Sequence, residues 1–229
     1  MDAVFSNFDD YLKAFGLTIG LFVVSGIGAL VLGTILAVLR VGPVSILNKA
    51  AALYVILFRN TPLLMIFIFM AIAMPVLGYN FKFVEDVEVG GWNVSAFFFR
   101  SCVALTLYTA AFVCEALRSG VNAVPLGQAE AGRAIGLTFA QSMREIVLPQ
   151  AARAVIPPMT SVLIALLKNT SVAAAFGMAE AVATMRGLTN NNADQRIGIF
   201  LAFAIGYILV VEAISVASTL LERKVRVAR

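Results

Sequence analysis

The sequence predicts an all-α integral membrane protein, and its composition and five long apolar stretches carry this prediction. Of its 229 residues, 61% are apolar and 13% are charged, and the mean hydropathy is +0.93. Soluble domains usually contain about 45–50% apolar and about 25% charged residues. The chain is short enough for its apolar segments to pack as one unit, so we predict a single transmembrane domain over residues 1–229.

Five stretches are long enough to cross a membrane, because about 20 apolar helical residues span its hydrocarbon core. They cover residues 17–39, 53–77, 97–117, 155–176 and 197–221. The third and fourth contain Glu115 and Lys168, and charges inside spans are expected to face the helix bundle or a cavity. We expect Arg100 and Glu212 to belong to span ends and helix contacts.

Lysine and arginine are unevenly divided between the two sides of these spans. Eleven lie in or beside one set of connections: Arg40, Lys49, Arg59, Arg118, Arg133, Arg144, Arg153, Arg223, Lys224, Arg226 and Arg229. Four lie on the other side: Lys13, Lys82, Arg186 and Arg196. Basic residues concentrate on the cytoplasmic side of a membrane. The N-terminus is therefore predicted outside and the C-terminus in the cytoplasm.

The sequence offers few ligands for a metal or cofactor. It contains no histidine, and its two cysteines, Cys102 and Cys114, are too far apart along one helix to pair. We therefore expect no metal site in this chain. The formal charge of +4 is explained by the cytoplasmic bias of basic residues, so no nucleic-acid partner is expected.

The long cytoplasmic connection between the third and fourth spans carries the signals of two short helices at residues 125–149. Proline suits the first turn of a helix, and glycine suits the left-handed residue that ends one. A first short helix is therefore predicted from Pro125 to Ile135, with Gly136 after it.

A second short helix is predicted directly after the first. Thr138 and Gln141 have the spacing of a capping box, and Pro149 is expected to stop the helix. On these residues alone, the helix pair either shields the ends of the neighbouring spans or docks a partner protein.

A gapped pattern runs through these two helices: Glu130, Ala131, Gly136, Ile146, Leu148 and Pro149. It resembles the loop signature of ATP-binding-cassette importer permeases, which begins Glu-Ala-Ala and ends Ile-x-Leu-Pro, and we therefore call residues 125–149 the coupling segment. Gly132 stands where the family usually has alanine. Glycine there is expected to weaken the first helix by about 0.5–1 kcal/mol. The resemblance implies that a partner ATPase contacts Glu130, Ala131, Gly132, Gly136, Leu148 and Pro149.

The chain contains no Gly-x-x-x-x-Gly-Lys-Ser/Thr phosphate loop. ATP and magnesium are therefore expected on the partner ATPase, and we expect this chain to be no enzyme.

Other motifs look like those of the polar amino-acid permeases, the histidine, glutamine and glutamate uptake group. They are Arg59-Asn60-Thr61-Pro62-Leu63, Tyr108, the run from Glu115 to Gly120, Pro149-Gln150-Ala151 and Leu167-Lys168-Asn169-Thr170-Ser171. Asn60 and Asn169 depart from the commonest residues at these positions, which are Gly and Asp. The chain looks most similar to permeases of actinobacterial glutamate importers.

This resemblance implies a substrate and a set of partners. The substrate is a polar amino acid, with glutamate ahead of glutamine and aspartate. The partners are a second, different permease, an ATPase dimer and an extracellular substrate-binding protein, around a multi-pass subunit in the bacterial plasma membrane.

Eight residues are candidates for the translocation path or its gate: Arg59, Thr61, Pro62, Glu115, Lys168, Asn169, Thr170 and Ser171. Lys168 either has a structural role, in an ion pair with Glu115 or bonded to carbonyls of a neighbouring helix, or it lines the gate or meets a substrate carboxylate. Arg59 and Glu115 lie at similar predicted depth and are expected to pair across helices. Pro62 is expected to bend the second span.

A secondary transporter or channel subunit is the alternative function, but the sequence shows no paired internal repeats. A membrane enzyme is disfavoured because the sequence lacks histidine and any nucleophile–base constellation. A scaffold subunit would not need the docking signature.

Overall fold

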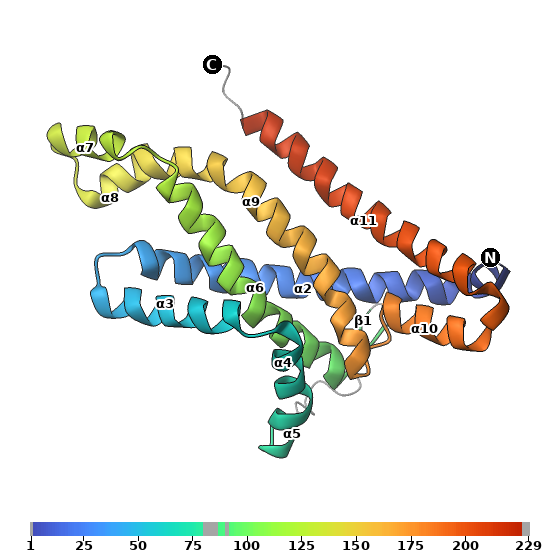
Figure 1. Cartoon of the computed structure of the whole chain (residues 1–229). Helices are drawn as coiled ribbons and strands as arrows, with labels where there is room; N and C mark the ends of the chain where they lie inside the picture. Colours follow the sequence, from blue (N-terminus) through green and yellow to red (C-terminus); the bar gives the residue numbers. More distant parts are fainter. Residues whose placement is uncertain (1, 80–86, 90–91, 226–229) are drawn as a thin grey trace.

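The computed structural model describes residues 2–79, 87–89 and 92–225, which form a bundle of long helices (Figure 1). Its principal helices are α2 (Phe8–Val41), α3 (Ser45–Asn60), α6 (Ala96–Asn122), α9 (Leu148–Asn169) and α11 (Arg196–Val225), and the short α1 (Asp2–Ser6) precedes α2. Within the described residues, four helical segments are long and apolar enough to cross a membrane, and a bent helix pair makes a fifth. The predicted helical membrane fold is therefore confirmed. A small antiparallel hairpin of β1 (Val87–Val89) and β2 (Trp92–Val94) is its one departure among the described residues.

The second predicted span is broken rather than continuous. The pieces that follow α3 are α4 (Leu63–Ile68), the π-helical turn η1 (Phe69–Ala73) and α5 (Met74–Val76). They make an angle of 100° with α3. A residue that precedes proline avoids the helical region, and Thr61 before Pro62 is extended (φ −92°, ψ 127°). The hydroxyl and the amide of Thr61 both donate to the Leu57 carbonyl, at 2.8 and 3.1 Å. The bend expected at Pro62 in the span predicted at residues 53–77 is therefore confirmed, and it is a complete break between two helices.

The coupling segment begins with α7 (Leu126–Ala134), and a tight turn then leads into one continuous helical run. This run consists of α8 (Phe139–Ser142), the π-helical turn η3 (Met143–Val147), α9 and the 3₁₀ turn η4 (Thr170–Phe176). Pro149 does not stop the second short helix, contrary to the prediction. It lies in the first turn of α9, where a missing N–H is tolerated. The Leu148 amide just before it bonds to the Met143 carbonyl across a widened turn, so a register shift accommodates the proline.

The opposite end of the bundle is built around α10. η4 ends at Gly177, which has φ +86°. α10 (Ala181–Asn191) and the 3₁₀ turn η5 (Ala193–Gln195) then lead into α11. Figure 1 shows α10 beside the N-terminus at one end of the molecule, and α7 and α8 at the other end. The coupling segment is thus separated from α10 by the length of the bundle.

Glycine lets α2 and α9 approach the central helix α6 closely. A Cβ atom added at Gly33 of α2 would lie 2.6 Å from Val113 Cβ and 2.9 Å from the Ala110 carbonyl oxygen of α6. One added at Gly120 of α6 would lie 2.9 Å from the Ala151 carbonyl oxygen of α9. Small residues serve the same purpose at many membrane helix interfaces. In α6, half of the most apolar 18-residue stretch is buried within the chain.

Gly33→Ala is expected to destabilise the protein. The added methyl group would meet the backbone and a β-branched side chain, so overpacking should cost about 1–3 kcal/mol. The thermal midpoint of the detergent-purified protein should fall. Gly187→Ala in α10 is the matched control, because nothing lies within 4 Å of its added Cβ. Equal midpoints for the two variants would contradict the close packing of α2 on α6.

Candidate coupling segment and translocation residues

The coupling segment is a compact helical hairpin whose boundaries follow from its caps. α7 begins after Pro125 and ends at Ala134, within one residue of the prediction at each end. Gly136 has φ +89°, the left-handed conformation expected of it. The Thr138 amide donates to Gln141 Oε1 at 2.9 Å, and the Gln141 amide donates to Thr138 Oγ1 at 3.3 Å. The predicted capping box is confirmed.

The two faces of α7 differ sharply. Gly132 is buried against α8 and η3, where an added Cβ would lie 2.7 Å from Ile146 Cδ1 and 3.2 Å from Ser142 Oγ. Glycine at this position therefore lets the two short helices pack closely, which is a physical reason for its departure from alanine. Glu130 lies two residues earlier, about 200° around the helix, and is exposed.

The outward surface of α7 combines two charged side chains, Glu130 and Arg133, with apolar ones. Glu130, Ala131 and Gly136 are all exposed. Leu126 is 81% exposed and Ile135 is 79% exposed. Large apolar side chains presented around a carboxylate are typical of a protein-docking surface. We call Leu126, Glu130, Ala131, Ile135 and Gly136 the α7 docking surface.

Leu148 and Pro149 belong to the first turn of α9. Leu148 lines an apolar groove of about 660 Å³ together with Val41 at the end of α2 and Leu117 of α6. The six residues expected to contact an ATPase are thus divided among an outward surface, a buried packing position at Gly132, and the base of α9.

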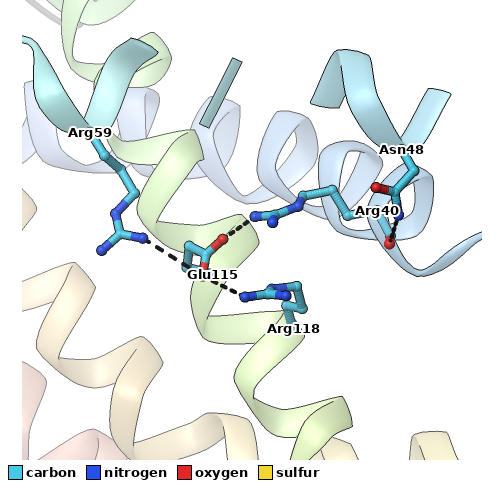
Figure 2. A network of polar contacts seen from close by, with 5 residues as sticks. All are labelled: Arg40, Asn48, Arg59, Glu115 and Arg118. Carbon is cyan, nitrogen blue, oxygen red and sulfur yellow. Dashed lines mark hydrogen bonds and ion pairs between the residues drawn. The ribbon is translucent and has the colours of Figure 1, made fainter. Parts of the chain in front are cut away.

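Glu115 lies at the centre of a cluster of three arginines (Figure 2). Its carboxylate forms a hydrogen-bonded ion pair with Arg40 of α2, and lies 3.7 Å from Arg59 Nη1 of α3 and 3.4 Å from Arg118 Nη2 of α6. The Arg59 guanidinium also lies over the Phe112 ring, 5.7 Å from its centroid. The side chains are partly exposed, from 16% for Arg40 to 45% for Arg59.

The expected pairing of Arg59 with Glu115 is confirmed, whereas the alternative pair of Glu115 with Lys168 does not form among the described residues. Sequence reasoning missed both Arg40 and Arg118. The spacing of three residues between Glu115 and Arg118 was a usable signal, because such residues are neighbours on a helix. Arg40 is 75 residues away from Glu115 in the sequence, and only helix packing brings them together.

The polar segment at residues 167–171 does not form one site. Thr170 is fully buried, and its hydroxyl donates to the Leu167 carbonyl at 2.6 Å. Lys168 and Ser171 line a pocket of about 380 Å³ between α9 and α11, together with Tyr207 and Glu212. Asn169 lines a different pocket of about 370 Å³ between α6 and α9, together with Tyr108, Thr109 and Ser161. The structure therefore divides the predicted gate residues among two pockets and the packed interior.

Glu180 is a buried acid that sequence reasoning did not identify. It is 0% exposed, and its Oε1 accepts hydrogen bonds from the Val182 and Ala183 amides at 2.9 and 3.0 Å. Tyr207 of α11 donates to Oε2 at 3.0 Å. The Ala181 amide donates to Thr18 Oγ1 of α2 at 3.1 Å. Glu180 thus caps α10 and ties it to α11, while Thr18 ties it to α2.

Glu180→Ala is expected to lower stability by about 2–4 kcal/mol. It would leave two amides at the start of α10 and the Tyr207 hydroxyl without their acceptor in a buried site. The thermal midpoint should fall and α10 should become sensitive to protease. Glu145→Ala, a 64% exposed acid in η3, is the control and should stay within about 0.5 kcal/mol. An unchanged midpoint for Glu180→Ala would show that the cap is dispensable.

Comparison with known proteins identifies the chain. The family model for the inner membrane component of binding-protein-dependent transport systems matches residues 29–227. The glutamate transport system permease protein GluC of Corynebacterium efficiens is 42% identical over 203 residues, which are 86% of each chain. The glutamate/aspartate import permease protein GltJ of Escherichia coli is 36% identical over 219 residues, covering 93% of this chain and 86% of that one.

The fold is also found among solved structures. The crystal structure of an amino acid ABC transporter with histidines superposes with a TM-score of 0.83 and covers 96% of both chains at 22% identity. The chain therefore belongs to the family of inner membrane components of binding-protein-dependent transport systems, and is a multi-pass permease subunit of an amino-acid ABC importer in the bacterial plasma membrane.

Proposed function

We propose that this permease carries glutamate into the cytoplasm, and that glutamine and aspartate are the next candidates. Support for an acidic substrate comes from two relatives above 30% identity, whose names specify glutamate and glutamate/aspartate. We also propose that a partner ATPase drives this transport. That part of the proposal rests on the α7 docking surface, in which Glu130 is exposed between Leu126 and Ile135 in the sequence.

A partner ATPase drives the cycle by binding the α7 docking surface. α7 suits this role because it packs against α8 and η3 through Gly132, so a force on α7 passes into the continuous helix that leads to α9. The N-terminus lies outside and the C-terminus in the cytoplasm, which puts α7 on the side where ATP is available. ATP and magnesium bind the ATPase dimer, and this chain holds no cofactor.

A second, different permease and an extracellular substrate-binding protein complete the importer. The translocation path follows α9 and the start of η4, where Lys168, Asn169 and Ser171 line two pockets. Two features hold the helices beside this path. One is the ion-pair cluster of Glu115 with Arg59 and its other arginines, and the second is the helix break at Thr61 and Pro62.

Uptake by the reconstituted complex tests this proposal. The complex of both permeases and the ATPase is placed in vesicles, and uptake of radiolabelled glutamate is followed with ATP and the substrate-binding protein. We expect ATP-dependent uptake that excess aspartate or glutamine reduces and excess arginine does not. Uptake without ATP would support a secondary transporter, and uptake of arginine in place of glutamate would refute the acidic substrate.

A further inference from the structure

Two arginines at the α10 end of the bundle line one pocket. Arg186 of α10 and Arg196 at the start of α11 border a space of about 390 Å³. The other residues that line it are Met185, Thr189, Asn190, Ile197 and Phe200. We call these seven residues the α10–α11 pocket. Figure 1 shows α10 beside the N-terminus, at the end of the molecule opposite α7.

The positive charge of this pocket is not balanced within the chain. Both arginine side chains are exposed, and neither forms an ion pair with a carboxylate in the part of the chain that the structure describes. Asp194 is close to Arg196 in the sequence but does not line the pocket. This side of the spans carries only four lysines and arginines against eleven on the other. Two of the four lining one pocket is therefore more than the usual charge bias explains.

The length of α11 puts the pocket at the level of phospholipid headgroups. α11 has 30 residues, which makes it about 45 Å long, or about 42 Å along the membrane normal at a typical tilt of about 20°. A bilayer with its headgroup layers is about 40–45 Å thick. Arg196 is the first residue of α11, and Arg223 and Lys224 lie in its last turn. The two ends of α11 therefore lie in the two headgroup layers.

The lining of the pocket combines phosphate-binding and apolar side chains. Arginine binds phosphate oxygens through paired, charge-assisted hydrogen bonds. Beside the two arginines, Ile197 is 78% exposed and Phe200 is 58% exposed. A soluble anion would leave these apolar side chains uncovered, whereas a phospholipid brings both a phosphate and acyl chains. A protein that docks from the aqueous side would meet Arg186 but leave Phe200, one turn deeper along α11, in the membrane.

The pocket is formed without a ligand, because α10 is held in place by contacts on its other side. Glu180 ties the start of α10 to α11, and Thr18 ties it to α2. Met185, which precedes Arg186, packs against the buried cluster that contains Phe203 of α11. Arg186 is therefore carried on a helix whose position relative to α11 is already fixed.

We propose that the α10–α11 pocket binds one anionic phospholipid from the leaflet at this end of the bundle. Its phosphate lies between Arg186 and Arg196, and the first carbons of its acyl chains lie over Ile197 and Phe200. Phosphatidylglycerol fits because its headgroup carries a net negative charge, whereas the choline of phosphatidylcholine cancels that charge. The proposal goes beyond glutamate import, because no step of transport as proposed above requires a bound lipid.

Photolabelling of the assembled importer tests the proposal. The probe is a phosphatidylglycerol with a photoreactive group near the start of one acyl chain, and peptide mapping locates its adducts. We expect saturable labelling within residues 185–200. Unlabelled phosphatidylglycerol should compete at least 10-fold better than phosphatidylcholine, and millimolar inorganic phosphate should not compete. Effective competition by phosphate would mean a site for a soluble anion and would overturn the proposal.

Substitutions test the two arginines directly. One basic residue at a membrane surface changes binding to anionic lipid by about fivefold, so Arg186→Gln and Arg196→Gln should each raise the half-saturating probe concentration about fivefold, and the double variant about 30-fold. Arg186→Lys with Arg196→Lys keeps both charges and should lose much less. Lys13→Gln is the control, because Lys13 is an exposed cation at the same end that lines another pocket with Asp9 and Asp10. It should leave the labelling of residues 185–200 unchanged.

Three results of these substitutions would overturn the proposal. The first is equal labelling of the wild type and the double glutamine variant at an unchanged thermal midpoint. The second is an equal effect of Lys13→Gln, which would show only general attraction to the membrane surface. The third is a double glutamine variant that keeps phospholipid labelling but no longer binds the substrate-binding protein, since the arginines would then dock that protein.

Discussion

Glu130→Lys is expected to abolish ATP-driven uptake while leaving the chain folded. Glu130 is exposed on the face of α7 opposite the buried Gly132, so its replacement disturbs no packing within the chain. The reversed charge would instead lie at the centre of the α7 docking surface. Losing one well-placed charge pair at an interface costs about 2–5 kcal/mol. ATPase binding should therefore weaken by roughly 30-fold or more.

The measurements for Glu130→Lys are ATP-dependent uptake in vesicles and copurification of the ATPase. Glu145→Lys in η3 is the matched control, because Glu145 is an exposed acid in the same hairpin and pairs with Arg144, at 3.5 Å. We expect the control to retain both uptake and ATPase. If both variants behave alike, the α7 docking surface is not where the ATPase binds.

Glu115→Gln is expected to destabilise the bundle by about 2–3 kcal/mol. Glutamine keeps the shape of the side chain but removes the one negative charge among Arg40, Arg59 and Arg118. Breaking a buried ion pair costs about 3–5 kcal/mol. The partial exposure of Arg59 (45%) and Arg118 (39%) lowers the expected loss, because solvent screens part of the repulsion. The thermal midpoint of the purified protein is the measurement.

A second substitution separates charge repulsion from a general packing defect. In the Glu115→Gln background, Arg118→Gln removes one of the three cations and should restore part of the lost stability. Glu145→Gln removes a surface carboxylate and should have almost no effect. A double variant less stable than Glu115→Gln would mean that the arginines do more than balance the charge of Glu115.

Local signals in the sequence predicted the coupling segment well. The caps at Pro125, Gly136 and Thr138 each depend on conformations that one or a few residues determine, and the structure reproduces them. The prediction that Pro149 ends the second short helix failed, because proline breaks a helix when it lies in the interior but is tolerated in the first turn. The π-helical turn before Pro149, which accommodates it, has no signal in the sequence.

The polar site residues were predicted less completely. The pair of Arg59 and Glu115 followed from similar depth in two spans, but depth along a helix says nothing about the direction of a side chain. For that reason the sequence could not show that Glu115 pairs with arginines while Lys168 lies in a separate pocket.

The sequence by itself determined that the chain crosses the membrane about five times, carries a helical coupling segment and resembles amino-acid importer permeases. These properties depend on apolar length, capping residues and a spaced motif, all of which are local. Tertiary structure alone decided that Glu180 joins α10 to α11, that Arg40 reaches Glu115, and that Lys168 and Glu212 line one pocket. Each of these contacts depends on how the helices are rotated and packed against one another. That packing is determined by residues far apart in the sequence, so no local pattern predicts it.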